Sequence, residues 1–227
     1  TATVTGITDR GQSKVVETAD GTGYEARTLI LATGAEHASL DAPGEAAYKG
    51  RGVSYCATCD GAFFRGKDVA VVGGGDVAVE DAIYLARMCR KVWLVHRRDS
   101  LRAAKSLQQK LMSCENTEIL WNRTLAAVQG ADLVEKVTLR SVMDETEEEL
   151  PVDGVFIAVG MHPNTEAFRA AVPCDEKGYV LAGEDCATKV PGIFAAGDIR
   201  TKQVRQIITA AADGACAVAS VEKYLNL

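Results

Sequence analysis

Two cysteines separated by two residues are the part of the sequence best suited to chemistry. The run Cys56-Ala57-Thr58-Cys59 is followed directly by Asp60. This spacing allows a small disulfide that opens and closes by thiol exchange, and Asp60 is placed to act as its general acid or base. Cys56, Cys59 and Asp60 are therefore the candidate catalytic residues, although Asp60 could also be a simple turn residue.

Zinc binding is the rival use of this cysteine pair. A zinc site would need two more ligands at suitable spacing. The sequence has no second close pair of cysteines, and His37, His96 and His162 form no ligand pattern, so we expect no metal. The other cysteines are expected to behave as small hydrophobic residues: Cys89, Cys114, Cys174, Cys186 and Cys216.

A glycine loop lies between an apolar run, 69–72, and a helical pattern, 76–90. The first glycine of such a loop allows a sharp turn, the second lets the backbone approach a pyrophosphate at the helix N-terminus, and a small residue after it permits close packing. The loop predicts a dinucleotide site, and the alternative is a turn without a ligand. The candidate contacts are Gly73, Gly74, Gly75, Asp76, Val77 and Ala78.

The next strand, 92–95, ends in a basic segment, which distinguishes the two nicotinamide dinucleotides. A site for NAD favours an acidic residue at this point, whereas the sequence here is His96-Arg97-Arg98-Asp99, followed by Arg102. Guanidinium groups suit the geometry of a 2′-phosphate, so these residues predict NADPH. The alternative is a solvated basic helix end, with Asp99 capping a helix over roughly 101–114.

A third apolar run, 193–196, ends in Gly197-Asp198. An acidic residue at the end of a buried strand can accept hydrogen bonds from a sugar-like hydroxyl. The last predicted helix begins near Gln206, and its N-terminus would stabilise negative charge at the same place, as on a reduced flavin. Taken alone, a strand, a turn and an acidic cap explain this motif equally well.

Composition sets limits on these interpretations. The chain has 227 residues, 47% of them hydrophobic and 25% charged, as in ordinary globular proteins of one large or two small domains. The net charge of −6 argues against nucleic acid or an anionic membrane as the partner. No apolar stretch is long enough to cross a membrane, and the odd number of mostly dispersed cysteines favours the reducing cytoplasm.

The pattern of apolar runs predicts an α/β chain in which residues 67–95 form a strand, a helix and a second strand. Further strands are predicted near 118–121, 125–128, 133–142 and 155–159. The acidic run 144–149 is expected at a solvated hairpin tip.

The opening of the chain reads as a β-meander. Predicted strands at 13–19 and 23–27 flank the turn Asp20-Gly21, and 28–34 reads as a strand buried on both faces. The segments 35–50 and 162–164 are predicted crossings between domains.

Together, these motifs resemble those of the low-molecular-weight, bacterial-type thioredoxin reductases. The similarity spans nearly the whole chain in the order of that family. The matching segments are 32–34 (Ala-Thr-Gly), 50–54 (Gly-Arg-Gly-Val-Ser), 56–61 (Cys-Ala-Thr-Cys-Asp-Gly), 73–80 (Gly-Gly-Gly-Asp-Val-Ala-Val-Glu), 96–102 (His-Arg-Arg-Asp-Ser-Leu-Arg), 160–164 (Gly-Met-His-Pro-Asn), and 192–198 with Arg205-Gln206.

The resemblance implies a Rossmann-like, three-layer NADPH domain at 38–161, inserted into an FAD-binding domain of the same type formed by 1–37 and 162–227. It implies that electrons pass from NADPH through FAD to the cysteine pair and then to thioredoxin in a cytoplasmic homodimer. Cys59 would face the flavin, Cys56 would attack the partner disulfide, and Asp60 would be the acid. The implied site adds Gly160 for NADPH, and for FAD it contains Thr33, Gly34, Gly197, Asp198, Arg205, Gln206 and Ile207.

One departure from the family keeps alternatives open. The family begins with an FAD-binding strand, glycine loop and helix of about a hundred residues, which this sequence does not contain, so we expect an incomplete FAD domain and a chain that is part of a longer one. The alternatives are a related reductase of a peroxiredoxin system and a non-catalytic NADP-binding fragment. A ferredoxin-dependent relative is disfavoured, because it would not need the glycine loop or the arginines.

Overall fold

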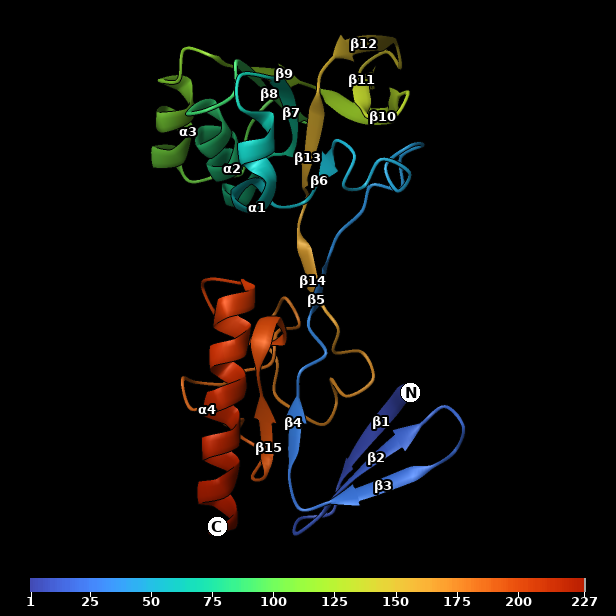
Figure 1. Cartoon of the computed structure of the whole chain (residues 1–227), viewed down its shortest axis with the longest axis vertical. Coiled ribbons are helices and arrows are strands. Elements are labelled where there is room, and N and C mark those ends of the chain that lie inside the picture. Colours follow the sequence, from blue (N-terminus) through green and yellow to red (C-terminus); the bar gives the residue numbers. More distant parts are fainter. Residues whose placement is uncertain (227) are drawn as a thin grey trace. The chain divides into compact units, whose positions relative to one another are not determined.

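The computed structural model describes residues 1–226 and divides into two compact units. Unit 1 contains Thr1–Glu36 and Met161–Leu227, and unit 2, His37–Gly160, is inserted into it. Figure 1 labels the elements. In unit 1 they are β1 (Val4–Asp9), β2 (Lys14–Thr18), β3 (Gly23–Ala26), β4 (Leu29–Leu31), β14 (Met161–Pro163), β15 (Ile193–Ala195), a 3-10 turn (Gly197–Ile199) and α4 (Ile207–Leu225).

Unit 2 begins at the last residue of the crossing strand β5 (Ala35–His37), which pairs with β14. Its remaining elements are β6 (Val53–Ser54), α1 (Ala57–Asp60), a 3-10 turn (Gly61–Phe64), β7 (Asp68–Gly73), α2 (Asp76–Ala86), β8 (Lys91–His96), α3 (Lys105–Met112), β9 (Thr117–Trp121), β10 (Arg123–Gly130), β11 (Val134–Ser141), β12 (Glu147–Pro151) and β13 (Gly154–Ala158).

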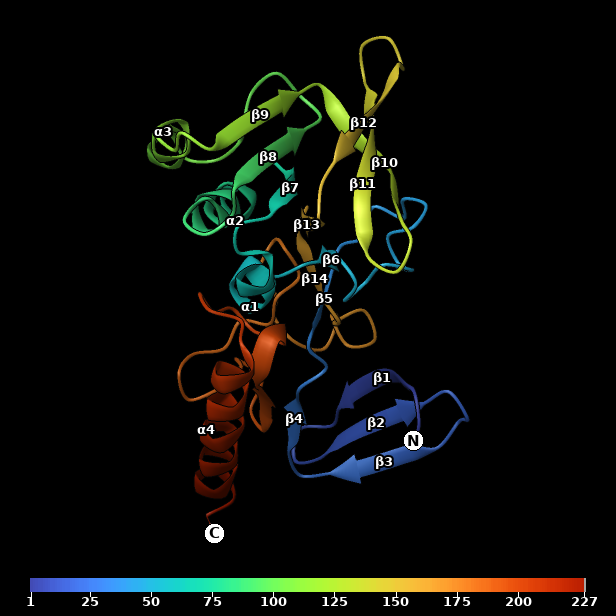
Figure 2. The same ribbon diagram turned by 45° about the horizontal axis from the view of Figure 1, so that its top comes forward.

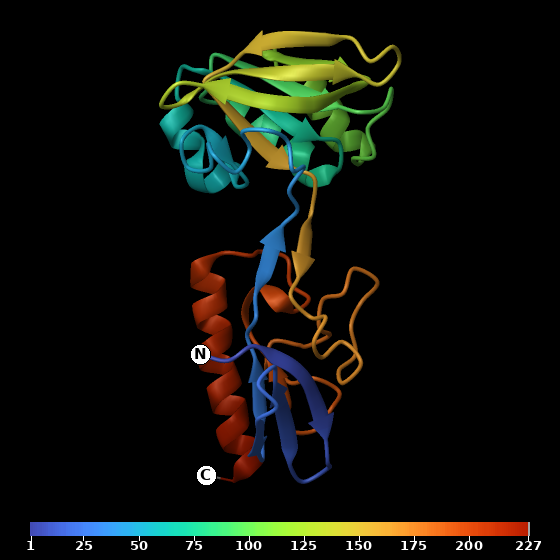
Figure 3. The ribbon, with the colours of Figure 1, turned by 90° about the vertical axis from the view of Figure 1, so that its right-hand side faces the viewer.

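Five parallel strands form the centre of unit 2, in the order β6-β13-β7-β8-β9. The apolar runs of β13, β7 and β8 are buried on both faces, as expected of inner parallel strands, whereas the edge strand β9 is only partly buried. The helices α1, α2 and α3 cover one face, and the antiparallel sheet β10-β11-β12 covers the other (Figure 3). Unit 2 is therefore the predicted three-layer, Rossmann-type α/β unit.

Unit 1 combines the predicted β-meander β1-β2-β3 with the short parallel pair β4-β15 and the long helix α4 (Figure 2). The prediction that 28–34 is buried on both faces is wrong for Ile30, which is 41% exposed. The apolar side chains of the last helix are largely exposed. Ile207 and Ile208 are 90% and 76% exposed, and of the described residues of α4 only Asp213 and Ala217 are buried.

Helix α3 begins four residues later than the sequence pattern predicts. The backbone N–H of Arg102 donates to the carbonyl of Gly74, and that of Ala104 donates to Asp76 Oδ1, both at 2.8 Å. These donors hold 101–104 against the glycine loop, so the segment cannot coil into the helix. The N-cap residue is Ala104, with no side-chain cap, so the alternative role of Asp99 as a cap is also wrong.

The prediction that the whole acidic run 144–149 is a hairpin tip is also wrong. Only its first part turns, and the rest forms the strand β12, which pairs with β11. Basic side chains of neighbouring strands neutralise the acids through three ion pairs: Arg140–Glu147, Arg123–Glu148 and Lys136–Glu149. Cross-strand pairs of opposite charge favour such a strand despite its composition.

A buried ion cluster joins α4 to the turn after β15. The Asp213 carboxylate accepts hydrogen bonds from Arg200 and Lys202, and from the backbone N–H of Gly197. The three side chains of the cluster are almost fully buried. Burial would raise the pKa of Asp213, but the hydrogen bonds from Arg200, Lys202 and Gly197 outweigh it and hold that pKa well below its ordinary value.

We expect Asp213→Ala to lower the free energy of unfolding by about 3–5 kcal/mol, because it leaves two buried cations without a counter-charge. Urea unfolding measures this, with Glu222→Ala, an exposed acid on the same helix, as the control. A lowered carboxyl pKa adds stability above the unfolded-state pKa, and this stability is lost as pH falls through the folded-state pKa. The difference in unfolding free energy between the wild type and Asp213→Ala should therefore decrease as the pH is lowered. At neutral pH, a variant that unfolds at the same urea concentration as the wild type would contradict the prediction.

No helix within residues 1–226 is both long and apolar enough to cross a membrane.

Candidate active site

Cys56 and Cys59 are joined by a disulfide at the start of α1. Cys56 is the N-cap residue of this short helix, and its sulfur accepts a hydrogen bond from the backbone N–H of Cys59 at 3.2 Å. A backbone N–H directed at sulfur favours the thiolate over the thiol. The arrangement therefore suits a Cys56 that is released as a nucleophile when the disulfide is reduced.

Asp60 is held beside this disulfide by Ser54, at the end of β6. The Ser54 hydroxyl donates to Asp60 Oδ2 at 2.7 Å and accepts from the backbone N–H of Cys56 at 3.1 Å. This relay connects the carboxylate to the cysteine pair through one side chain. Sequence reasoning did not select Ser54, because only its place at the end of a buried parallel strand brings it between the two groups.

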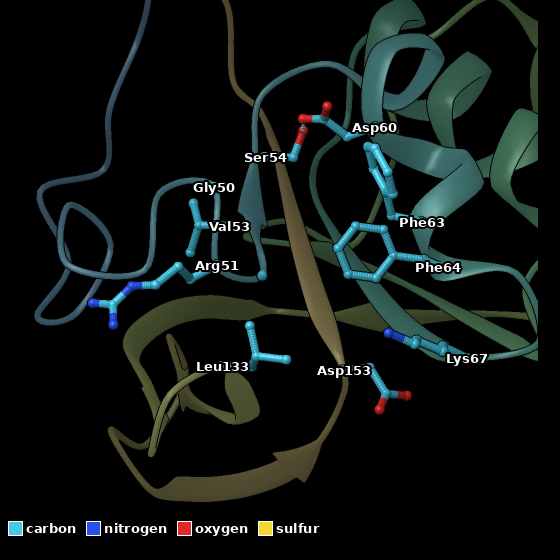
Figure 4. Close-up of a pocket in the computed structure, with 11 residues that line it drawn as sticks. Gly50, Arg51, Val53, Ser54, Asp60, Phe63, Phe64, Lys67, Leu133 and Asp153 are labelled. Carbon is cyan, nitrogen blue, oxygen red and sulfur yellow. Dashed lines mark hydrogen bonds between the residues drawn. The ribbon is translucent and has the colours of Figure 1, made fainter.

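A cavity of about 200 Å³ lies next to Asp60 (Figure 4). Phe63, which is 74% exposed, lies at this cavity beside Asp60, and Phe64 reaches into it from the same 3-10 turn. Arg51 and Lys67 add positive charge to the lining. An exposed aromatic ring beside Asp60 provides an apolar surface against which another protein can pack.

A larger cavity, of about 340 Å³, lies at the carboxyl ends of β7, β8 and β13. Ligands of open parallel sheets bind at this edge. Five of the predicted residues line it, namely Gly73, Gly74, His96, Arg97 and Arg102. Sequence reasoning missed Leu40, Arg123 and Val159, which also line it, because the crossing segment, β10 and the end of β13 contribute them from distant parts of the chain.

The three glycines of the loop have different constraints. A Cβ on Gly73 would lie 2.6 Å from the Cβ of Ala78, so this pair sets the close packing of β7 against α2. A Cβ on Gly75 would meet no atom within 4 Å, so its backbone faces open space. Gly75 is also the N-cap of α2, which has no side-chain cap. The backbone N–H groups of this helix end are therefore available to a pyrophosphate.

Gly74 lies against the ring of His96. A Cβ on Gly74 would be 2.2 Å from two ring atoms of that histidine, which is buried and cannot move aside easily. We expect Gly74→Ala to lower the affinity for NADP⁺ at least about tenfold and the free energy of unfolding by about 1–3 kcal/mol, because overpacking displaces the loop. Calorimetric titration measures the affinity. Gly214→Ala, whose Cβ would meet nothing, is the control, and unchanged NADP⁺ binding by Gly74→Ala would contradict the prediction.

Other predicted dinucleotide contacts lie outside the lining of this cavity. Asp76 holds the backbone of Ala104, Val77 is exposed, and Arg98 is exposed on the loop next to the lining arginines. Gly160 directly follows the lining residue Val159 and has open space where a side chain would project. These four residues remain candidates for contact with a bound dinucleotide.

In unit 1, four of the predicted flavin residues follow the parallel strands β4 and β15: Thr33 and Gly34 after β4, and Gly197 and Asp198 after β15. The hydroxyl of Thr33 donates to the carbonyl of Asn164 at 2.6 Å, which fixes the turn at Gly34. After β15, Asp198 Oδ1 is buried without a hydrogen-bond partner. Arg205 stacks on Tyr179 and likewise leaves its Nε without one.

The last helix begins near these groups in the chain, as predicted, but Gln206 has a local task. Its side chain forms a reciprocal capping box with Thr209 at the start of α4. Ile207 directly follows it and is almost fully exposed. The side chain of Gln206, one of the predicted flavin contacts, is therefore already used to cap α4.

Comparison with known proteins agrees with this geometry. The family profile of the pyridine nucleotide-disulphide oxidoreductases matches residues 1–214. The thioredoxin reductase of Listeria innocua is 49% identical over 221 residues, which cover 97% of this chain and 69% of that protein. The thioredoxin reductase of Bacillus subtilis is 47% identical, with 97% of this chain and 70% of that protein covered. The chain belongs to the thioredoxin reductase family.

A solved structure supports the same relationship. The thioredoxin reductase of Streptococcus pyogenes is 45% identical and has a TM-score of 0.94, covering 99% of this chain and 74% of that one. As a member of the thioredoxin reductase family, the chain is expected to use FAD as well as NADPH. Asp198 Oδ1 and Arg205 Nε are buried without hydrogen-bond partners, and they fit such a group. A hydroxyl of the ligand would donate to Asp198, and a phosphate oxygen would accept from Arg205.

Proposed function

We propose that the chain carries the NADPH-binding and disulfide-reducing parts of a thioredoxin reductase, in which electrons pass from NADPH through FAD to the Cys56–Cys59 disulfide and on to thioredoxin. The observation that carries this proposal is the disulfide at the start of α1, with Asp60 held beside it by Ser54. The cavity lined by Arg97 and Arg102 lies in the same unit and supports NADPH as the electron donor.

The proposal assigns residues 38–161, which match unit 2 to within one residue at each end, to NADPH and the cysteine pair. Segments 1–37 and 162–227 contribute to FAD binding, with Thr33, Gly34, Asp198 and Arg205 as the residues that would hold it. The bound flavin supplies the two-electron step between the hydride donor and the disulfide. Asp198 would accept a hydrogen bond from a hydroxyl of this group, and Arg205 would donate to one of its oxygens.

The cysteine chemistry follows from the two thiols that reduction of the disulfide produces. The Cys56 thiolate, favoured by the N–H of Cys59, attacks one sulfur of the thioredoxin disulfide and forms a mixed disulfide. The Cys59 thiolate then displaces the thioredoxin thiol and closes the Cys56–Cys59 bond, so two electrons leave the chain. Asp60 delivers or accepts the proton through its position beside the pair.

Thioredoxin is proposed to dock where Phe63 is exposed beside the disulfide. An apolar side chain of the partner would cover this ring. We also propose a cytoplasmic homodimer. The five cysteines without a disulfide partner in the described chain favour a reducing compartment.

The test is anaerobic reduction of the protein supplied with FAD. NADPH should bleach the visible flavin absorption, and oxidised thioredoxin should restore it with stoichiometric formation of thioredoxin thiols. NADH should act much more slowly. Bleaching without any transfer to thioredoxin would refute the proposed acceptor, and preference for NADH would refute the proposed donor.

A further inference from the structure

The ring of His96 joins the two loops that flank the dinucleotide cavity. Its Nδ1 lies 3.0 Å from the carbonyl oxygen of Gly73, and its Nε2 lies 3.0 Å from the carbonyl oxygen of Ser100. The residue is 5% exposed. Both ring nitrogens are therefore used within the protein, and the sequence-based prediction that His96 contacts the dinucleotide directly is not what this geometry favours.

The two partners of His96 are both acceptors. A neutral imidazole carries one N–H, so it can donate to one carbonyl and must turn a lone pair toward the other. An imidazolium carries two N–H groups and can donate to both. The charged form therefore matches this geometry better, and it would hold the glycine loop and the arginine loop together at both ends of the ring.

The charges around His96 disfavour the imidazolium as long as no anion is bound. On its own loop, His96 has the cations Arg97, Arg98 and Arg102 and the single acid Asp99 as neighbours. From β10, Arg123 reaches the same cavity but is paired with Glu148, and from α2, Asp76 is bonded to the backbone of Ala104. From β9, only the neutral Trp121 faces the ring.

The pKa of His96 reflects this balance. Burial, the largest influence, lowers it, and the guanidinium groups of Arg102 and Arg98 lower it further, while hydrogen bonds to the carbonyls of Ser100 and Gly73 raise it. A phosphate monoester carries about −1.5 to −2 charges near pH 7. Placed between these arginines, it would remove the repulsion and leave the two carbonyls as the dominant partners.

We propose that His96 is a proton-linked positioning residue, which takes up a proton when the 2′-phosphate of NADPH binds and then joins the two loops as an imidazolium. This inference rests on the proposed function, because it requires NADPH at this cavity. By linkage, the proton strengthens binding of the phosphate as much as the phosphate strengthens binding of the proton. Discrimination between NADPH and NADH should therefore increase as the pH falls from 8 toward 7.

Calorimetric titration with NADP⁺ and NAD⁺ tests the proposal. Titrations at pH 7.5 in two buffers of different ionisation enthalpy give the number of protons bound with the ligand. We expect uptake of a substantial fraction of a proton, roughly one half, with NADP⁺ and none with NAD⁺. The phosphate itself, with a second pKa of about 6, would release protons, so it cannot mimic the expected sign.

Two variants assign the proton to one residue. His96→Asn should abolish the uptake and weaken NADP⁺ more than NAD⁺, whereas His162→Asn, a change in unit 1, should leave the uptake intact. The wild-type protein offers a measurement that needs no variant. With only three histidines in the sequence, the ¹⁵N signals of His96 should move from neutral to imidazolium values as NADP⁺, and not NAD⁺, is added.

The outcomes separate this inference from the proposed function. If NADP⁺ and NAD⁺ bind equally, the proposed NADPH site is wrong and the inference falls with it. If NADP⁺ binds more tightly but His96 stays neutral, or if His96→Asn retains the full uptake, the inference alone is overturned and the NADPH site stands.

Discussion

Replacing Cys56 by serine is expected to lower NADPH-dependent reduction of thioredoxin roughly a thousandfold or more. The variant loses both the disulfide and the sulfur that accepts the hydrogen bond from Cys59. A serine hydroxyl cannot form a mixed disulfide, so no electron pair can leave toward the partner. Reduction of the flavin by NADPH should persist, because that step does not require the cysteine pair.

The rate of thioredoxin thiol formation and the rate of flavin bleaching measure the two steps separately. Cys216→Ser is the matched control, because Cys216 is exposed and carries no disulfide. It should retain full turnover. Thioredoxin turnover by Cys56→Ser within an order of magnitude of the wild type would refute the role assigned to Cys56.

Exchanging two of the three arginines that line the dinucleotide cavity for acids, as Arg97→Glu with Arg102→Glu, should weaken binding of NADPH at least about a hundredfold. Each charge-assisted hydrogen bond to a phosphate contributes about 1.5–3 kcal/mol, and the new carboxylates repel the 2′-phosphate. NADH lacks this phosphate, so its affinity should change by less than about threefold. The dissociation constants of both dinucleotides, determined by fluorescence titration, test the difference.

A pair of charge reversals elsewhere on the same unit controls for long-range electrostatics. Arg87 and Lys110 are exposed on or next to the helices that cover the sheet. Arg87→Glu with Lys110→Glu changes the net charge by the same amount without touching the cavity and should alter both affinities little. Equal losses of NADPH and NADH in the arginine variant would contradict the assignment of the 2′-phosphate.

Local sequence patterns predicted the parts of the fold that depend on near neighbours. The buried strand before Gly73, the helix after Gly75 and the turn at Asp20-Gly21 occur where their patterns place them. The disulfide also follows from local spacing, because Cys56 and Cys59 are separated by only two residues.

The features that were predicted incorrectly depend on distant partners. The start of α3 is delayed because Arg102 and Ala104 donate to residues almost thirty positions earlier in the chain. The acidic strand β12 exists because basic residues on β10 and β11 lie beside it. Contacts between residues far apart in the chain leave no repeating pattern of apolar and polar residues, so the sequence pattern could not indicate them.

The same limit applies to the candidate site. His96 bonds to Gly73, 23 positions earlier in the chain, while Ser54 bonds to the nearby Cys56 and Asp60, and neither residue type reveals these partners. His96 could be selected only as a member of a basic segment. Its two carbonyl partners became evident only when the loops at Gly73 and Ser100 were placed on either side of the ring.

The pairing of β5 with β14 has a practical consequence for protein engineering. The N–H of Ala38 donates to the carbonyl of Gly160 at 3.0 Å, so the chain leaves and re-enters unit 1 at neighbouring points. A segment whose two ends already touch can be cut out, closed into a ring or exchanged for a homologous cassette without stretching its host.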